Sequence, residues 1–139
     1  MVPVTGTPYA RPLDAVDEMS VSRTDTGWIL RIAKTVRRTD AYMSGHFPGL
    51  ILYPAVFLLE TVRQAAGRAV ETAPDGWWEI TTVRRLRLRR PMHEGHLLDL
   101  EVVLTPAGEG DPALTAAVTV RHGDQPVAEL SLRLEPGAI

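Results

Sequence analysis

The sequence contains no cysteine, only one lysine among fifteen basic residues, and no long apolar run. The absence of cysteine excludes disulfides and thiolate zinc sites. No apolar stretch approaches the roughly 20 residues that a membrane-spanning helix needs. No signal-like leader opens the sequence either. We therefore predict a cytoplasmic protein that makes no contact with a membrane.

The remaining composition is that of an ordinary globular domain. The chain has 139 residues, of which 45% are hydrophobic and 23% charged. A chain of this length forms one domain with its own core. We expect that domain to span residues 1–139, with residues 1–12 as a loose leader because three prolines and a glycine fall there. The net charge of −2 gives no attraction to nucleic acid.

Hydrophobic periodicity predicts one helix among several strands. The β-rich residues 28–36 predict a first strand. A helix is expected from Pro54 to about Thr72, because proline suits a first helical turn and Pro74 follows the last one. Up to Val62 this helix is apolar on nearly every side, so we expect it to be buried on most of its circumference.

Period-two alternation then predicts four further strands, over residues 81–90, 98–104, 113–121 and 128–135. Glycine-containing turns separate the last three of them, and the turn at residues 122–124 predicts a tight hairpin. One buried helix followed by an antiparallel meander is an α+β arrangement. We expect a curved antiparallel sheet wrapped around one long central helix.

The strongest functional signal is a histidine turn followed by an isolated acid. His46 lies within Gly45-His46-Phe47-Pro48-Gly49, where glycine and proline hold the backbone in a specific shape. Glu60 follows fourteen residues later within the apolar residues 56–62. Burial would raise the pKa of Glu60, which suits a proton donor, and an imidazole accepts a proton near neutral pH. The two residues predict acid/base catalysis; the alternative is a surface Glu60 paired with Arg63.

Three weaker signals accompany this one. The amides of Ala55 and Val56 open the predicted helix, where donors have no intrahelical partner, so they form a candidate oxyanion hole or bind water. Arginines recur along the predicted strand 81–90, as either a solvated face or a docking surface for an acidic partner. The members of this row are Arg85, Arg87 and Arg89. His93 and His96 are too few to predict a metal site.

These residues resemble the signature of the β-hydroxyacyl-acyl-carrier-protein dehydratases, a family with the hot-dog fold. The core of the match is the His46 turn, Pro54 and Glu60. Looser matches at residues 40–43 and 87–95 extend the resemblance over roughly residues 36–135. Two positions differ from the family pattern, because Ile51 stands where the family has proline and Ala55 where it has glycine.

The resemblance implies both an activity and an assembly. The activity is dehydration of a 3-hydroxyacyl thioester, held on an acyl carrier protein, to the trans-2-enoyl thioester in fatty acid or polyketide synthesis. His46 and Glu60 would be the catalytic pair, with Gln64 orienting the acid, the amides of Ala55 and Val56 binding the thioester carbonyl, and no metal or redox cofactor. The assembly is a homodimer, an oligomer of dimers or a heterodimer with a related subunit, in which one subunit supplies His46 and the other Glu60. The expected residues of the substrate tunnel are Phe47, Pro48, Gly49, Tyr53 and Pro54.

Two other functions stay open at this stage. A hot-dog thioesterase would use the same helix amide and a carboxylate with water as nucleophile, but thioesterases generally lack the His-Phe-Pro-Gly turn. A non-catalytic, dehydratase-like subunit would pair with an active partner. Ile51 and Ala55 favour that second alternative, whereas the presence of both His46 and Glu60 argues against it.

Overall fold

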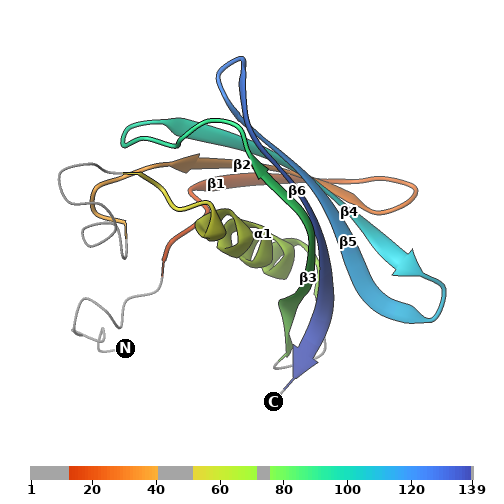
Figure 1. Ribbon diagram of the computed structural model, residues 1–139. Helices are drawn as coiled ribbons and strands as arrows, with labels where there is room; N and C mark the ends of the chain where they lie inside the picture. Colours follow the sequence, from red (N-terminus) through yellow and green to blue (C-terminus); the bar gives the residue numbers. More distant parts are fainter. Residues whose placement is uncertain (1–12, 41–51, 72–75, 139) are drawn as a thin grey trace, which may run out of the picture.

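The computed structural model describes residues 13–40, 52–71 and 76–138. Within these residues all strands lie in a single antiparallel sheet of order β1-β2-β4-β5-β6-β3. The sheet curves around the helix, which lies along its concave side (Figure 1). The predicted α+β architecture is therefore confirmed. The elements are β1 (Glu18–Arg23), β2 (Trp28–Thr35), α1 (Val56–Ala69), β3 (Gly76–Leu88), β4 (Leu97–Gly108), β5 (Asp111–His122) and β6 (Gln125–Ala138).

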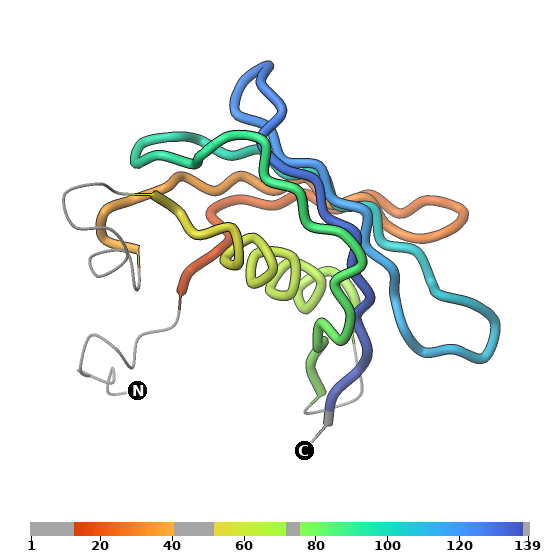
Figure 2. The backbone as a smooth tube through the Cα atoms, viewed as in Figure 1, coloured from red at the N-terminus to blue at the C-terminus, as the bar shows by residue number. Residues whose placement is uncertain are grey.

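The strand order differs from the predicted four-strand meander. β4, β5 and β6 are joined by tight turns in which Gly110 and Gly123 have φ values of 76° and 59°. β3 precedes them in the chain but lies beyond β6, at the edge of the sheet. Figure 2 shows β3 and β6 bending together around α1. Period-two alternation identifies the buried face of a strand but not its neighbour, so β3 could not be placed from its sequence.

The core fills the space between the sheet and α1. On β4 the alternate residues Leu98, Leu100, Val102 and Leu104 are at most 2% exposed, as the alternation predicted. α1 contributes one face, on which its buried residues are Leu58, Thr61, Val62, Ala65 and Ala66.

The other face of α1 is open in the single chain. Val56 is 58% exposed. Several other residues of this face are half-buried, namely Phe57, Leu59, Glu60, Arg63 and Gln64. The expectation that α1 is buried on most of its circumference is therefore wrong for one chain. Apolar composition alone did not distinguish residues that face this chain's sheet from residues that face outward.

The ends of α1 also differ slightly from those predicted. The helix begins at Val56, because the carbonyls of Pro54 and Ala55 first accept hydrogen bonds from Phe57 and Leu58 in a tight turn, at 2.9 and 3.0 Å. It ends at Ala69, and the indole of Trp78 donates to the carbonyl of Val70 at 2.9 Å. Thr72, the predicted end, lies outside the described residues.

Candidate active site

The first turn of α1 is held from two sides. The amide of Tyr53 donates to the carbonyl of Met92 at 2.8 Å, and the Tyr53 ring meets Phe57 edge-on with centroids 5.3 Å apart. Ala55 adopts helical dihedrals, with φ −58° and ψ −33°. The amides of Ala55 and Val56 thus precede the first hydrogen-bonded turn, where the helix dipole adds partial positive charge. This geometry suits a carbonyl oxygen that gains negative charge.

Tyr53 itself lies in the core and is only 3% exposed. Its hydroxyl oxygen is buried and has no hydrogen-bond partner among the described residues. Burial raises the pKa of this phenol, so it stays protonated. Pro54, the other predicted tunnel residue that the structure describes, is half-buried.

Glu60 lies on the open face of α1 and binds two side chains of its own helix. Arg63 donates from Nε at 2.9 Å and from a terminal nitrogen at 2.5 Å, and Gln64 donates at 3.0 Å. The Glu60 side chain is 34% exposed. The Arg63 hydrogen bonds lower the pKa of Glu60 below its ordinary value, and partial burial opposes this only in part. The predicted raised pKa is therefore wrong for the single chain, and the alternative pairing with Arg63 is observed.

Gln64 connects Glu60 to a segment that sequence analysis missed. Its amide nitrogen donates to the carbonyl of Leu13 at 2.8 Å, and its oxygen accepts from the amide of Ala15 at 3.1 Å. Thr61 donates to the carbonyl of Ala15 at 2.9 Å. Residues 13–16 therefore run beside the helix at the position of Glu60. In the sequence, this contact is indicated only by the apolar residues among 13–16, which directly follow the expected leader.

The remaining predicted site residues lie outside the described residues. These are His46, Phe47, Pro48 and Gly49, together with the departure at Ile51. The chain is described again from Leu52, which forms an isolated antiparallel bridge with His93.

A buried ion pair lies just before this segment. Lys34 is 1% exposed and donates to Oδ1 of Asp40 at 2.7 Å, while Oδ2 of Asp40 accepts from the amide of Arg37 at 2.8 Å. This pair was not predicted from the sequence. The signal was present, because Lys34 continues the buried alternation of Leu30 and Ile32 along β2.

The arginine row runs along the exposed half of β3, and its last member, Arg89, directly follows the end of the strand. Arg85 and Arg89 both reach Glu129 of β6, at 3.4 and 3.1 Å, and Arg87 lies opposite Glu129 in the register. The three arginines therefore share one side of the strand. The same half of β3 also exposes Val83, Leu86 and Leu88, which are 45%, 39% and 44% exposed. No described element covers this part of the strand.

Three histidines gather near the connection between β3 and β4. The rings of His96 and His122 stack with centroids 3.9 Å apart, and His93 meets His96 edge-on at 5.3 Å. Burial lowers the pKa of His96 the most, and the two neighbouring imidazole rings lower it further. Among the described residues no group of three or more acidic or histidine side chains is arranged to hold a metal ion.

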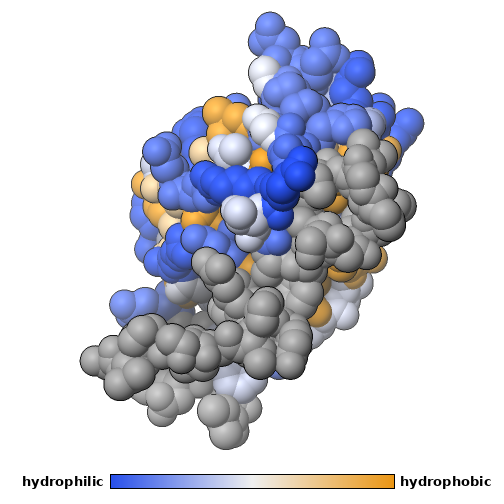
Figure 3. Space-filling model, turned by 90° about the vertical axis from the view of Figure 1, so that its left-hand side faces the viewer, coloured by the Kyte–Doolittle hydropathy of each residue, from blue (hydrophilic) through white to orange (hydrophobic). Residues whose placement is uncertain are grey.

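Figure 3 shows the end of the molecule that lies at left in Figure 1, where hydrophilic residues surround smaller hydrophobic patches.

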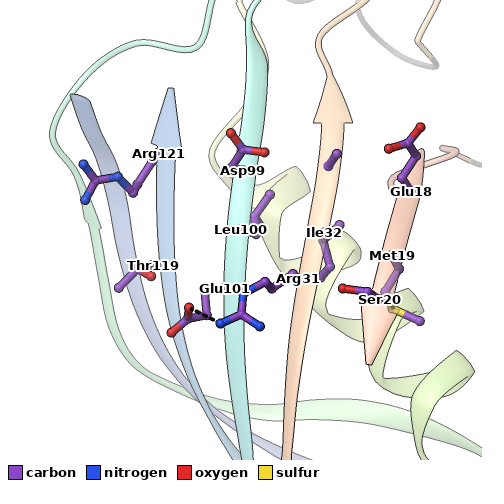
Figure 4. A pocket seen from close by; sticks show the side chains of 11 residues that line it. Glu18, Met19, Ser20, Arg31, Ile32, Asp99, Leu100, Glu101, Thr119 and Arg121 are labelled. Atoms are coloured by element: carbon purple, nitrogen blue, oxygen red, sulfur yellow. Dashed lines mark ion pairs between the residues drawn. The ribbon is translucent and has the colours of Figure 1, made fainter. Parts of the chain in front are cut away.

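A shallow groove of about 700 Å³ crosses the outer face of the sheet, away from α1. It is lined by polar and apolar residues of β1, β2, β4 and β5, including Arg31 and Glu101, which form an ion pair at 3.7 Å (Figure 4). None of the predicted site residues lines it.

Within the described ranges no helix is long and apolar enough to cross a membrane.

Known proteins resemble the chain in sequence. It is 33% identical to the 3-hydroxyacyl-[acyl-carrier-protein] dehydratase FabZ of Albidiferax ferrireducens over 103 residues, which cover 70% of this chain and 67% of that relative. It is 32% identical to the FabZ dehydratase of Sodalis glossinidius over 100 residues, and there the chain spans 65% of the relative's length. No family model matches the chain.

Solved structures resemble it in fold. The dehydratase heterocomplex ApeI:P from Xenorhabdus doucetiae matches with a TM-score of 0.62 at 18% identity, over 86% of this chain and 95% of that one. The fluoroacetyl-CoA thioesterase FlK matches with a TM-score of 0.64 at 13% identity, over 84% of this chain and 90% of that one. The predicted hot-dog fold is thereby confirmed.

Proposed function

The chain belongs to the family of 3-hydroxyacyl-acyl-carrier-protein dehydratases, and from this membership we propose that it dehydrates a 3-hydroxyacyl thioester to the trans-2-enoyl thioester. The observation that supports the proposal best is the placement of Glu60. It lies just over one helical turn after the amides of Ala55 and Val56, on the open face of α1, and Gln64 fixes its orientation. A carboxyl group and a carbonyl-binding helix end thus lie on one element.

The first chemical step is removal of the proton at C2. His46 accepts that proton, and the electron pair of the C–H bond moves through the thioester to its carbonyl oxygen. The resulting enolate is too unstable to form unless its oxygen is stabilised. The amides at Ala55 and Val56 supply that stabilisation at the positive end of the helix dipole.

The second step expels water from C3. The enolate electron pair forms the C2–C3 double bond, the C3–O bond breaks, and Glu60 protonates the departing hydroxyl. This role needs a protonated Glu60, whereas Arg63 favours the ionised form in the single chain. Covering the open face with a second subunit and an acyl chain would remove water from Glu60 and so raise its pKa. The dehydratase proposal therefore includes a dimer whose interface encloses this face.

Two features support a second subunit at this place. The open face of α1 and the edge strand β3 both expose aliphatic side chains, among them Val56, Val83 and Leu86. A long, exposed edge strand with apolar residues pairs readily with another chain. In the proposed dimer, each site combines His46 of one subunit with Glu60 of the other. Phe47, Pro48, Gly49 and Pro54 would line the substrate tunnel.

Subunit exchange tests the shared site. His46→Ala and Glu60→Ala proteins, each inactive alone, are mixed and allowed to exchange. Random pairing makes half the dimers mixed, and one of the two sites in each mixed dimer is intact, so roughly a quarter of wild-type activity returns. Verified exchange with no recovery would place both residues in one chain.

The same proposal assigns the carrier protein to the arginine row. Arg85, Arg87 and Arg89 form a strip of positive charge that Glu129 offsets in part. An acidic carrier protein or the phosphate of its phosphopantetheine fits that strip. Changing Arg85 and Arg87 to Glu should raise KM for the carrier-bound substrate and leave turnover of a short soluble thioester unchanged. Equal losses on both substrates would contradict docking at this strip.

One observation favours a second candidate, an acyl thioesterase. The lowered pKa of Glu60 leaves a carboxylate that suits activation of water better than donation of a proton. The purified protein is therefore incubated with a 3-hydroxyacyl carrier protein, and the mass of the carrier is measured. Loss of water supports dehydration, loss of the whole acyl group supports the thioesterase, and no change indicates a non-catalytic subunit. His46→Ala serves as the control, because only dehydration needs its imidazole.

A further inference from the structure

We infer that the strap formed by residues 13–16 is a positioning element for Glu60 and acts on it through the side-chain amide of Gln64. The inference rests on the proposed function for the role of Glu60, whereas the contacts themselves do not depend on that role. The strap is not placed in contact with substrate. Its backbone sets the direction in which the Gln64 amide points, and the amide in turn holds the carboxyl group.

The strap is joined both to the core and to the sheet. Three of its residues are at most 7% exposed and belong to the core, namely Leu13, Ala15 and Val16. Asp17 directly follows the strap, and its amide donates to the carbonyl of Ala33 on β2 at 3.0 Å. The Asp17 carboxylate accepts from the amide of Thr35, also on β2, at 2.7 Å. The end of the strap is therefore held against a strand of the sheet.

The backbone of the strap is bonded to two side chains of α1. The amide of Ala15 donates to Oε1 of Gln64 at 3.1 Å, and the carbonyl of Leu13 accepts from Nε2 of Gln64 at 2.8 Å. The carbonyl of Ala15 accepts from the hydroxyl of Thr61 at 2.9 Å. Buried backbone groups that lie outside a helix or a sheet need such partners. Side chains of α1 supply them to the strap.

These contacts are compatible with one orientation of the Gln64 amide. With its two ends exchanged, the amide oxygen would face the carbonyl of Leu13 and the carboxyl group of Glu60, and the NH₂ group would face the N–H of Ala15. Acceptors would then meet acceptors, and a donor would meet a donor. In the observed orientation Nε2 has one N–H group for Leu13 and one for Glu60, at 2.8 and 3.0 Å. The strap therefore makes Gln64 a hydrogen-bond donor to Glu60.

The second N–H group of Gln64 indicates positioning rather than stability alone. One N–H group and the oxygen are enough to satisfy the strap, but the remaining N–H group reaches Glu60. Arg63, which also donates to Glu60, has a side chain that is 38% exposed. Gln64 is thus the contact that joins Glu60 to buried backbone. Position matters for a proton donor, because a displacement of about 1 Å can lower a rate about 100-fold.

The test removes one donor of the strap and leaves every side chain in place. Nonsense suppression replaces Ala15 by lactic acid, which puts an ester oxygen where the N–H group was. That oxygen and Oε1 of Gln64 are both acceptors and repel each other, so the amide should turn or shift. We expect kcat for dehydration to fall about 10-fold with an unchanged KM. The wild-type kcat in this protein would overturn the inference.

Ala113 provides a matched control. Its amide also donates to a side-chain oxygen, Oδ1 of Asp111 at 3.0 Å, and its side chain is also buried. Lactic acid at this position makes the same chemical change on β5, which holds none of the predicted site residues. The control protein should keep the wild-type kcat. An equal loss of kcat in both proteins would attribute the effect to a weakened fold and overturn the positioning role.

A double-variant cycle tests whether the strap acts through Gln64. Gln64→Leu removes the amide, so the ester at Ala15 no longer has an amide to displace. The ester should therefore lower kcat in the wild-type background and cause little further loss in Gln64→Leu. A loss of the same size in both backgrounds would mean that the strap acts by another route, and would overturn the inference.

A spectroscopic readout needs neither turnover nor the ester protein. The chain has two glutamines and no asparagine, so only Gln64 and Gln125 give side-chain amide signals in a ¹⁵N–¹H spectrum. Both N–H groups of Gln64 are hydrogen-bonded and should exchange slowly with solvent, whereas those of the exposed Gln125 should exchange fast. Fast exchange at Gln64 would overturn the inference even if the ester protein did not fold. Slow exchange in an inactive wild type would refute the proposed function and still support the placement of Glu60 by the strap.

Discussion

The two faces of α1 differ in what holds their side chains. On the face toward the sheet, Leu58 and Val62 are at most 1% exposed and are fixed by packing alone. On the open face, Glu60 is fixed by hydrogen bonds from Arg63 and Gln64. Packing stabilises the fold but carries no proton, whereas the bonded carboxyl adds little stability and can react. If Glu60 is the proton donor that we propose, stability and chemistry are therefore assigned to opposite sides of a single helix.

The largest expected effect comes from removing the reactive group of the open face. Glu60→Gln keeps the shape of the side chain but cannot donate a proton, so the dehydration rate should fall by about 10²–10⁴. The melting temperature should hardly change, because a partly exposed ion pair contributes at most about 1 kcal/mol. Steady-state kinetics and calorimetry measure both. Glu101→Gln, the same change on the outer face of the sheet, should leave the rate unaltered; a parallel loss there would mean that the effect is not local.

Truncation on the packed face should lower the stability of the fold and leave the reaction rate unchanged. Leu58→Ala leaves a cavity under the sheet and should lower the free energy of unfolding by about 2–5 kcal/mol. The folded protein should keep its kcat when assayed well below its melting temperature. Urea denaturation gives the stability, with Val56→Ala as an exposed control that should shift it by less than about 0.5 kcal/mol. If the kcat of Leu58→Ala fell in proportion to its free energy of unfolding, the packed face would affect the reaction as well as the stability, and the proposed division between the two faces would be wrong.

The amide at the start of α1 gives a further test. Ala55 has a φ of −58°, which proline adopts without strain. Ala55→Pro therefore removes the N–H group while keeping the local backbone, and loss of one oxyanion donor should lower kcat by about 10²–10³. Ala55→Ser retains the N–H group and should remain active. Wild-type activity of the proline variant would exclude this amide from the site.

The smallest expected effect is the response of the open face to acid. Because hydrogen bonds from Arg63 lower the pKa of Glu60 in the folded chain, the unfolded chain binds the proton more readily. The stabilisation is therefore complete above the unfolded pKa of about 4.5 and is lost as the pH falls through the lower folded pKa. It amounts to less than about 1 kcal/mol, since the pair is partly exposed. Urea titrations at about pH 5.5 and pH 3.5 should show a slightly smaller acid loss for Glu60→Gln than for the wild type. An equal loss would mean that the pair contributes nothing.

The sequence was sufficient for the features that depend on local pattern. Alternation placed Leu98, Leu100 and Val102 in the core, and the helix was found within a few residues of its ends. It was insufficient where the outcome depended on neighbours distant in the chain. β1 carries mostly polar residues and was not predicted.

The candidate site shows the same division. Glu60 and Gln64 were predicted from their spacing, and the structure brings them within 3.0 Å. The contact of Gln64 with Leu13 and Ala15 joins residues that are 51 and 49 positions apart, which no local pattern reveals. The predicted direction of the Glu60 pKa shift was wrong, because the prediction considered burial among apolar neighbours and not the hydrogen bonds from Arg63. The roles of His46 and Glu60 in catalysis remain predictions.

The position of β3 at the sheet edge has a consequence for biosynthesis. The ribosome completes β3 before β4 and β5, but its partner β6 is made after both. The nascent strand therefore waits unpaired, and its docking is a late, non-local step of the kind that slows folding. During that interval Val83, Leu86 and Leu88 are exposed together with bare backbone, a combination that favours aggregation. The interspersed arginines then act as gatekeepers, because their charge keeps two such nascent strands from associating before β6 arrives.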